Sequence, residues 1–132
     1  MATTLINPPD LVKPIGYSHG ATGTGRLLFV AGQIGSDREG KLVGDDLVEQ
    51  FDRALGSVVR VVEEAGGKAE HIVKLNLLVL DKNEYREKGR DMGAVYRNHM
   101  GRHFPAMTLA EVKGLWDEGA KVEVEAVAML PE

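Results

Sequence analysis

The sequence contains no cysteine and no long hydrophobic run. Without cysteine the chain has no disulfide framework, no thiolate nucleophile and no cysteine-based zinc site, which is compatible with a reducing compartment. The N-terminus has neither a basic start nor a long apolar run, so it does not read as a signal peptide. We therefore expect a cytoplasmic protein that has no membrane partner.

The chain also lacks an excess of positive charge and a cluster of aromatic residues. Sixteen Lys and Arg stand against twenty Asp and Glu, which gives a formal net charge of −4. The three Phe, three Tyr and one Trp are scattered, without the interleaved basic residues that accompany base stacking. Because phosphate backbones attract basic surfaces, we expect no nucleic-acid partner.

The composition is that of a folded domain. Hydrophobic residues make up 43% and charged residues 27% of 132 positions, close to the average for globular proteins. A chain of this length can form one compact domain that buries roughly two thirds of its unfolded surface. We therefore expect a single domain over residues 1–132.

Apolar spacing predicts an α+β order of elements. Residues 27–31, which follow a glycine-rich turn at 20–25, and residues 72–80 are apolar runs typical of buried strands, and 41–43 suggest a brief strand in a hairpin-like excursion. Apolar residues at helical spacing predict a helix over 46–65, capped by Asp45 or Asp46. A second helix is predicted from near Asn83, and strands over 106–113 and 121–130 follow.

The last two strands are predicted to pair as a hairpin with a long connection. Alternate residues of a strand face opposite sides, so 122, 124, 126, 128 and 130 form a small apolar face that fits beneath two helices. This leaves a mixed face that carries Met107, Leu109, Val127 and Met129, on the same side as Glu123. Such a face needs another cover, and self-association would provide it.

Two motifs suggest chemistry that their context does not support. Gly16–Gly20 matches the G-x-S-x-G pattern around Ser18, but the nucleophile elbow needs a strand before the serine and a helix after it. His99 and His103 have a zinc-like spacing, yet Gly101 interrupts it and no carboxylate lies between them, so no metal site is expected.

Two carboxylates of the last predicted strand leave two interpretations open. Glu123 and Glu125 lie two residues apart, so they share a strand face. Both are solvated in the ordinary case. The alternative is that one of them lies at a cleft and handles a water molecule, and the residues alone do not choose between these readings.

Six stretches together resemble the RidA family, also called YjgF, of small reactive-intermediate deaminases. They follow the order and spacing of the family from near residue 14 to near residue 130, and comprise Pro14–Gly20, Leu28–Ile34, Val61–Gly66, Ile72–Asp81, Phe104–Ala106 and Val122–Ala128. The resemblance implies a chorismate-mutase-like α+β fold, a mixed sheet with two helices on one face. It also implies a homotrimer in which the sheets form a central barrel and small-molecule ligands bind in clefts between subunits.

The resemblance also implies an activity and site residues. The best-known members hydrolyse enamine or imine tautomers such as 2-aminoacrylate to a 2-keto acid and ammonia, and no cofactor is expected. Tyr17 matches the pocket tyrosine, Gly32 the glycine whose backbone faces the ligand, and Glu123 the carboxylate that positions the attacking water. Leu109 stands where cysteine is often found, and Gly93 where asparagine is often found.

Met107 departs from the family, which has at this position an arginine that clamps the substrate carboxylate. Arginine grips a carboxylate through two charge-assisted hydrogen bonds, whereas methionine offers only a flexible thioether. We therefore expect a less anionic, more hydrophobic ligand or a degraded activity. Arg26, Arg90 and Arg97 are candidates to replace the missing charge.

Three functions remain in competition. The first is a hydrolase of small enamine or imine metabolites, with Glu123 acting on water, backbone groups near Gly32 stabilising charge and Tyr17 shaping the pocket. The second is a non-catalytic trimer that binds a small apolar or carbonyl ligand through Met107 and Leu109. The third is an RNA-related translation inhibitor or endoribonuclease, which the acidic balance disfavours.

Overall fold

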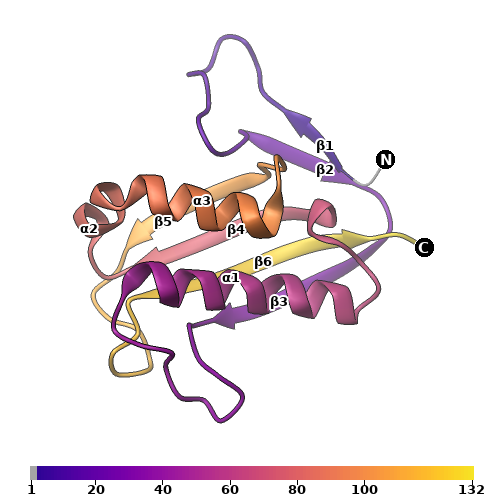
Figure 1. Ribbon diagram of the computed structural model, residues 1–132. Coiled ribbons are helices and arrows are strands. Elements are labelled where there is room, and N and C mark those ends of the chain that lie inside the picture. Colours follow the sequence, from indigo (N-terminus) through magenta and orange to yellow (C-terminus); the bar gives the residue numbers. More distant parts are fainter. Residues whose placement is uncertain (1–2) are drawn as a thin grey trace.

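The computed structural model describes residues 3–132 and contains a two-stranded and a four-stranded β-sheet (Figure 1). The elements in chain order are β1 (Thr3–Ile6), β2 (Gly20–Gly23), β3 (Arg26–Gln33), α1 (Leu47–Glu64), the 3-10 helix η1 (Ala69–His71), β4 (Ile72–Val79), α2 (Lys82–Glu87), α3 (Gly89–Met100), β5 (Ala106–Glu111) and β6 (Val122–Leu130). The two long helices, α1 and α3, lie side by side across one face of the larger sheet (Figure 1). The predicted mixed α+β architecture is confirmed.

Helix α1 begins and ends within one residue of its predicted limits. Asp46 is the N-cap, since its side chain accepts a hydrogen bond from the Glu49 backbone N–H at 3.1 Å. The helix ends before Gly66, whose φ of +97° suits glycine at a helix C-terminus. The predicted apolar stripe is buried against the sheet at Leu47, Phe51, Leu55, Val58 and Val62.

The second predicted helix is present as two helices. Asp81 caps α2 by accepting from the backbone N–H groups of Asn83 and Glu84. Lys88, with φ −96° and ψ 19°, follows α2 and precedes α3, so the helical path breaks at this residue. Within residues 3–132 no helix is both long enough and apolar enough to cross a membrane.

The four-stranded sheet has the order β3-β6-β4-β5, and this order contradicts the predicted hairpin. Strand β4 lies between β5 and β6, parallel to β5 and antiparallel to β6. A parallel pair needs a long crossover, and helices α2 and α3 supply it. The alternating side chains of β4 are buried at Ile72, Leu75, Leu77 and Val79, so this strand takes the interior position.

The register assigns the two faces of the sheet. Leu75 pairs with Met107 and with Ala126, and paired residues point to the same side. Leu75 and Ala126 are core residues, so Met107 lies on the helix side. The prediction that Met107 and Leu109 lie on the uncovered face was therefore wrong, because it relied on a β5–β6 pairing that does not form.

No helix of residues 3–132 lies on the opposite face of the sheet (Figure 1). Leu27 pairs with Met129 and Phe29 pairs with Val127, so these four side chains share that face. Leu27 is 58% and Phe29 72% exposed. The predicted mixed face therefore exists, with Val127 and Met129 on it as expected and with two β3 residues in place of Met107 and Leu109.

Two short segments differ from their predictions. Residues 20–23, expected to form a turn, make strand β2 and pair with β1. Residues 41–43, expected to form a strand, make only an isolated bridge between Ser36 and Leu42. The Asp37 carboxylate accepts hydrogen bonds from the backbone N–H groups of Glu39 and Lys41. The Lys41 N–H is therefore bonded within the turn and does not donate to a neighbouring strand.

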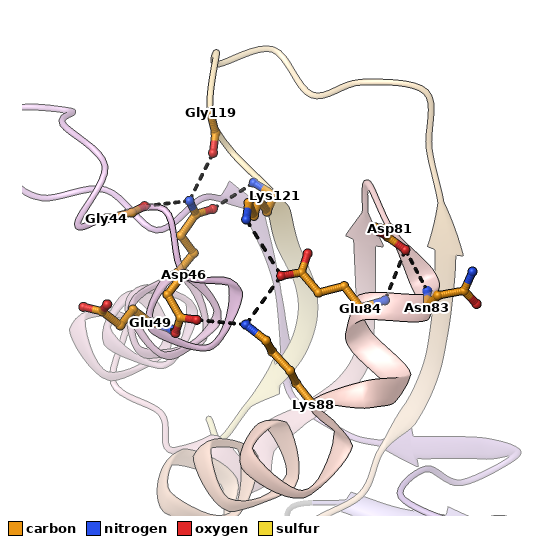
Figure 2. A network of polar contacts seen from close by, with 10 residues as sticks. Gly44, Asp46, Glu49, Asp81, Asn83, Glu84, Lys88, Gly119 and Lys121 are labelled. Carbon is orange, nitrogen blue, oxygen red and sulfur yellow. Dashed lines mark hydrogen bonds and ion pairs between the residues drawn. The ribbon is translucent and has the colours of Figure 1, made fainter.

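A polar network joins the start of α1 to α2, α3 and β6 (Figure 2). The Gln50 side chain is fully buried, donates to the carbonyls of Gly44 and Gly119 and accepts from the Lys121 N–H. Around it, Lys88 Nζ lies 3.0 Å from Asp46 Oδ1 and 3.5 Å from Glu84 Oε2. The Lys88 hydrogen bond, followed by that from the Glu49 N–H, lowers the pKa of Asp46.

Candidate functional site

The loop that carries Tyr17 is fixed to the start of β5 by Ser18. The Ser18 N–H donates to the Pro105 carbonyl at 3.0 Å, and its hydroxyl donates to the Phe104 carbonyl at 2.6 Å. Ser18 is only 4% exposed. Its hydroxyl is thus a structural donor, which agrees with the sequence reading against a nucleophile, and its neighbour Tyr17 is brought beside Met107.

Tyr17, Met107 and Leu109 line one cavity of about 360 Å³. The remaining lining residues are Ile15 and Gly16 of the same loop and Tyr85 of α2. Ile15 is 88% exposed, so the rim of the cavity is apolar. The lining contains no charged side chain, and we call this site the tyrosine cavity.

None of the three arginines proposed to replace the missing charge lines the tyrosine cavity. Arg26 begins β3 and pairs with Leu130, and β3 is the edge strand opposite to β5 in the four-stranded sheet. Arg90 and Arg97 belong to α3. Gly93 is likewise on α3 and outside the cavity lining, and a Cβ there would lie 3.2 Å from the Arg97 guanidinium.

Glu123 and Gly32 form a second candidate half-site, at the junction of β6 and β3. The β3–β6 register shifts between Val30 and Gln33, so Gly32 sits at an irregularity of the ladder. A Cβ at Gly32 would overlap the Glu123 carboxylate, so glycine is needed for this close approach. The structure therefore brings together these two residues, which the sequence had assigned to one pocket.

The Glu123 carboxylate differs from that of Glu125 two residues later. Asn76 donates to Glu125 Oε1 at 3.0 Å, whereas the half-buried Glu123 side chain has no hydrogen bond or ion pair with any residue of 3–132. A carboxylate held against backbone without a partner is available to a ligand or a water molecule. Of the two carboxylates, Glu123 is therefore the one that fits the interpretation in which a carboxylate at a cleft handles a water molecule.

The two half-sites do not meet within one chain. Leu109 pairs with Leu77, which also pairs with Val124, so Leu109 lies on the helix side of the sheet. Glu123 is the neighbour of Val124 in the strand and therefore points to the opposite side. The expectation that Glu123 faces Met107 and Leu109 across paired strands was wrong for the reason given above, the insertion of β4.

Tyr85 is a cavity residue that the sequence reading did not select. Its ring packs edge-on against Phe51, with centroids 6.4 Å apart, and burial raises the pKa of its hydroxyl. The helix predicted from near Asn83 includes Tyr85, but no role in the pocket was predicted for this residue. Tyr85 reaches the cavity because the connection between the parallel strands β4 and β5 places α2 beside β5. The sequence predictions did not include this parallel pair.

The two histidines with zinc-like spacing have separate partners. His99 Nε2 lies 2.6 Å from Asp52 Oδ1 on α1, and His103 Nε2 donates to the Ile72 carbonyl at 2.7 Å. In the part of the chain that the structure describes, no group of three or more His, Cys, Asp or Glu side chains is arranged to hold a metal ion. The histidines thus link α3 to α1 and the segment after α3 to β4.

Comparison with known proteins matches the chain over almost its whole length. Residues 10–130 match the family model described as Endoribonuclease L-PSP. A RutC family protein of Pyrococcus abyssi is 34% identical over 129 residues, covering 97% of this chain and 98% of the relative. A 2-iminobutanoate/2-iminopropanoate deaminase of Salmonella typhimurium is 32% identical over 123 residues, covering 93% and 92%.

A solved structure shares the fold. The crystal structure of a protein of unknown function of the conserved Rid protein family from Yersinia pestis superposes with a TM-score of 0.87 and 28% identity. The match covers 98% of this chain and 100% of that one. The chorismate-mutase-like fold implied by the resemblance is thereby confirmed.

Proposed function

The chain belongs to the endoribonuclease L-PSP family of RidA and YjgF proteins, and we propose that it hydrolyses small enamine or imine compounds to a carbonyl product and ammonia. The observation that carries this proposal is the Glu123 carboxylate, half-buried against Gly32 and without a partner among residues 3–132. A similar chain from Salmonella typhimurium bears the name of an imine deaminase, which supports the same reaction class.

The proposed reaction needs one water molecule and one general base. The Glu123 carboxylate accepts a proton from water as the oxygen adds to the C=N carbon, the C=N electron pair moves to the nitrogen, and Glu123 returns the proton to that nitrogen. Glu123 then takes the proton of the new hydroxyl group and passes it to the nitrogen as the C–N bond breaks, so that ammonia leaves and a carbonyl group remains. Backbone groups beside Gly32 stabilise the developing charge at a fixed position.

The substrate range is proposed to differ from that of arginine-bearing relatives. Met107 and Leu109 give the tyrosine cavity an apolar wall, and no charged side chain lines it. A buried carboxylate without a charged partner loses roughly 1.5–3 kcal/mol of hydrogen bonding. A less anionic and more hydrophobic substrate therefore fits this cavity better than a 2-imino acid.

We propose further that the protein is a homotrimer whose clefts complete the site. The tyrosine cavity and Glu123 belong to opposite faces of the sheet, so one chain presents each half of the site separately. Leu27 and Phe29 are exposed beside Val127 and Met129, and this apolar face suits packing against another copy. The cavity of one subunit would then meet Glu123 of the next.

Two other functions keep some support. The apolar lining of the tyrosine cavity favours a non-catalytic trimer that binds a small apolar or carbonyl ligand. The family description names an endoribonuclease, but a net charge of −4 gives little attraction for RNA. RNA binding that falls steeply with salt would favour the latter function.

The experiment that tests the proposed function measures ammonia and keto-acid release from 2-aminoacrylate generated in situ. The protein is compared with its Met107→Arg variant and a blank without protein. Acceleration by the unmodified protein supports the deaminase function directly. Acceleration by the variant alone supports a competent scaffold whose natural substrate lacks the usual carboxylate. Acceleration by neither contradicts the proposal and favours the binding protein.

A further inference from the structure

The hydroxyl of Tyr85 lacks the kind of partner that the hydroxyl of Tyr96 has. Tyr96 donates to the His103 carbonyl at 2.6 Å, and its ring stacks on Phe104. Tyr85 makes no side-chain hydrogen bond to any residue of 3–132, although Tyr85 is packed against the core. Every fully buried side-chain nitrogen or oxygen in that range has a partner, so the Tyr85 hydroxyl is open to solvent. Tyr85 also lines the tyrosine cavity, so a ligand seated there contacts this side chain.

The Tyr85 ring is held in place by structure around it. Its edge-on contact with Phe51, a fully buried residue of α1, fixes one side. Helix α2, which carries Tyr85, is capped by Asp81. Glu84, the residue before Tyr85, has its Oε2 atom 3.5 Å from Lys88 Nζ and 3.8 Å from Lys121 Nζ (Figure 2). A donor fixed in this way loses little side-chain freedom when a ligand binds.

We infer that Tyr85 is a specificity-determining residue, whose hydroxyl donates a hydrogen bond to the carbonyl oxygen of an uncharged, amide-like or ketone-like ligand. The inference rests on the proposed function only in taking the tyrosine cavity as the ligand site. A neutral phenol satisfies a neutral carbonyl with one hydrogen bond. It cannot offset the desolvation of a carboxylate in a cavity whose lining is uncharged.

The remaining polar group of the cavity does not change this selection. Tyr17, whose ring lies edge-on to His19 at 5.5 Å, contributes a second phenol and again no charge. Burial raises the pKa of the Tyr85 hydroxyl, which keeps it protonated and able to donate at neutral pH. The cavity thus offers neutral donors on an otherwise apolar surface.

The test compares an amide with the carboxylate of the same shape, 4-methylpentanamide and 4-methylpentanoate, neither of which carries a second carbonyl group. Dissociation constants are measured by NMR on protein with labelled methionine methyl groups, with Met107 as the reporter in the cavity and Met129 as the reference outside it. We expect tighter binding of the amide by the unmodified protein. Tyr85→Phe should weaken amide binding about threefold to tenfold and leave acid binding unchanged. The matched control Tyr96→Phe should leave the ratio of the two constants unchanged.

Three results would overturn the inference: tighter binding of the acid, an unchanged ratio in Tyr85→Phe, or no Met107 shift with either ligand. Because binding requires no turnover, the Glu123→Gln variant separates this inference from the proposed function. An amide preference that is retained in Glu123→Gln while hydrolysis is lost agrees with both proposals, whereas an amide preference without any enamine hydrolysis in the unmodified protein contradicts the proposed function alone. Hydrolysis together with an unchanged ratio in Tyr85→Phe contradicts the inference alone.

Discussion

Polar side chains of the network at the start of α1 have hydrogen-bond partners, whereas Glu123 and Tyr85 in the two halves of the candidate site do not have them within residues 3–132. In the network, Gln50 makes three hydrogen bonds and Asp46 binds both Lys88 and a backbone N–H. In the candidate site, Glu123 and Tyr85 have no side-chain partner within residues 3–132. The fold thus satisfies the groups that hold it together and leaves open the groups suited to bind a ligand.

The difference separates stability from function along the chain. Changes in the network should lower the free energy of unfolding, because a lost partner of the buried Gln50 leaves polar groups unsatisfied and a change at Asp46 weakens the cap of α1. Changes at Glu123 or Tyr85 should alter turnover or binding with little change in stability. The following predictions test this separation, from the largest expected effect to the smallest.

Removing the charge of Glu123 should have the largest effect. Glu123→Gln should lower turnover by about 10²- to 10⁴-fold, because the amide cannot accept the proton of water. Steady-state ammonia release checks this. The matched control is Glu125→Gln on the same strand, whose partner is Asn76 and which should retain activity. A thermal unfolding midpoint lowered only in Glu123→Gln would indicate a structural role and break the separation.

Removing the amide of Gln50 should have the opposite signature. Gln50→Leu leaves two carbonyls and one N–H without partners and should lower the free energy of unfolding by about 3 kcal/mol. Urea denaturation measures the loss. Gln33→Leu, which removes one hydrogen bond to the Ala31 carbonyl, is the control and should cost far less. Equal losses of unfolding free energy in the two variants would contradict a special contribution of the Gln50 network to stability.

Adding a methyl group at Gly32 tests how closely Glu123 must be placed. Gly32→Ala forces the Glu123 carboxylate to move, and turnover should fall about tenfold because the base is displaced from the reacting water. Stability should change little, since a flexible side chain can yield. Gly114→Ala, in open space on the β5–β6 loop, is the control for kinetic measurements. Unchanged kinetics in Gly32→Ala would show that the position of Glu123 for catalysis does not depend on Gly32.

The charge on Asp46 should give the smallest effect, and one that depends on pH. The Lys88 hydrogen bond holds the pKa of Asp46 below its ordinary value of 3.8. A lowered pKa in the folded state stabilises the protein above about pH 4, and this contribution is lost as pH falls. Asp46→Asn keeps a capping side chain, so its stability deficit should be present at pH 7 and shrink below pH 4. A deficit that is constant with pH would contradict the assignment.

Local structure was predictable from local pattern. The periodicity of α1 and its Asp46 cap, and the breaker-free run that forms β4, all lie within short stretches whose residues agree with one another. The resemblance assigned Tyr17, Gly32, Met107, Leu109 and Glu123 to one pocket, and within one chain the structure places Gly32 against Glu123 and Tyr17 in one cavity with Met107 and Leu109. The helix and strand predictions depend on signals within a single stretch, whereas the assignment of pocket residues depends on six stretches in the order and spacing of the family.

Strand pairing was not predictable in the same way. β5 and β6 are neighbours in sequence, but β4 separates them because its alternate side chains are buried in the core. Which strands pair is decided by burial over the whole domain. The face assigned to Met107 and Leu109 was wrong for this reason, and Tyr85 was missed because only the crossover brings it to β5.

The central claim, that the tyrosine cavity of one copy acts with Glu123 of another, has a direct test in mixed oligomers. The wild-type chain is refolded together with a Met107→Arg/Glu123→Gln double variant, and ammonia release from 2-aminoacrylate is measured against the Met107→Arg protein, which this test requires to be more active than the wild type. If the site spans two copies, about a quarter of clefts combine the substituted cavity with an intact Glu123, and the mixture exceeds both parents. If the site lies within one chain, mixing yields no gain over the sum of the parents, and that result would contradict the account.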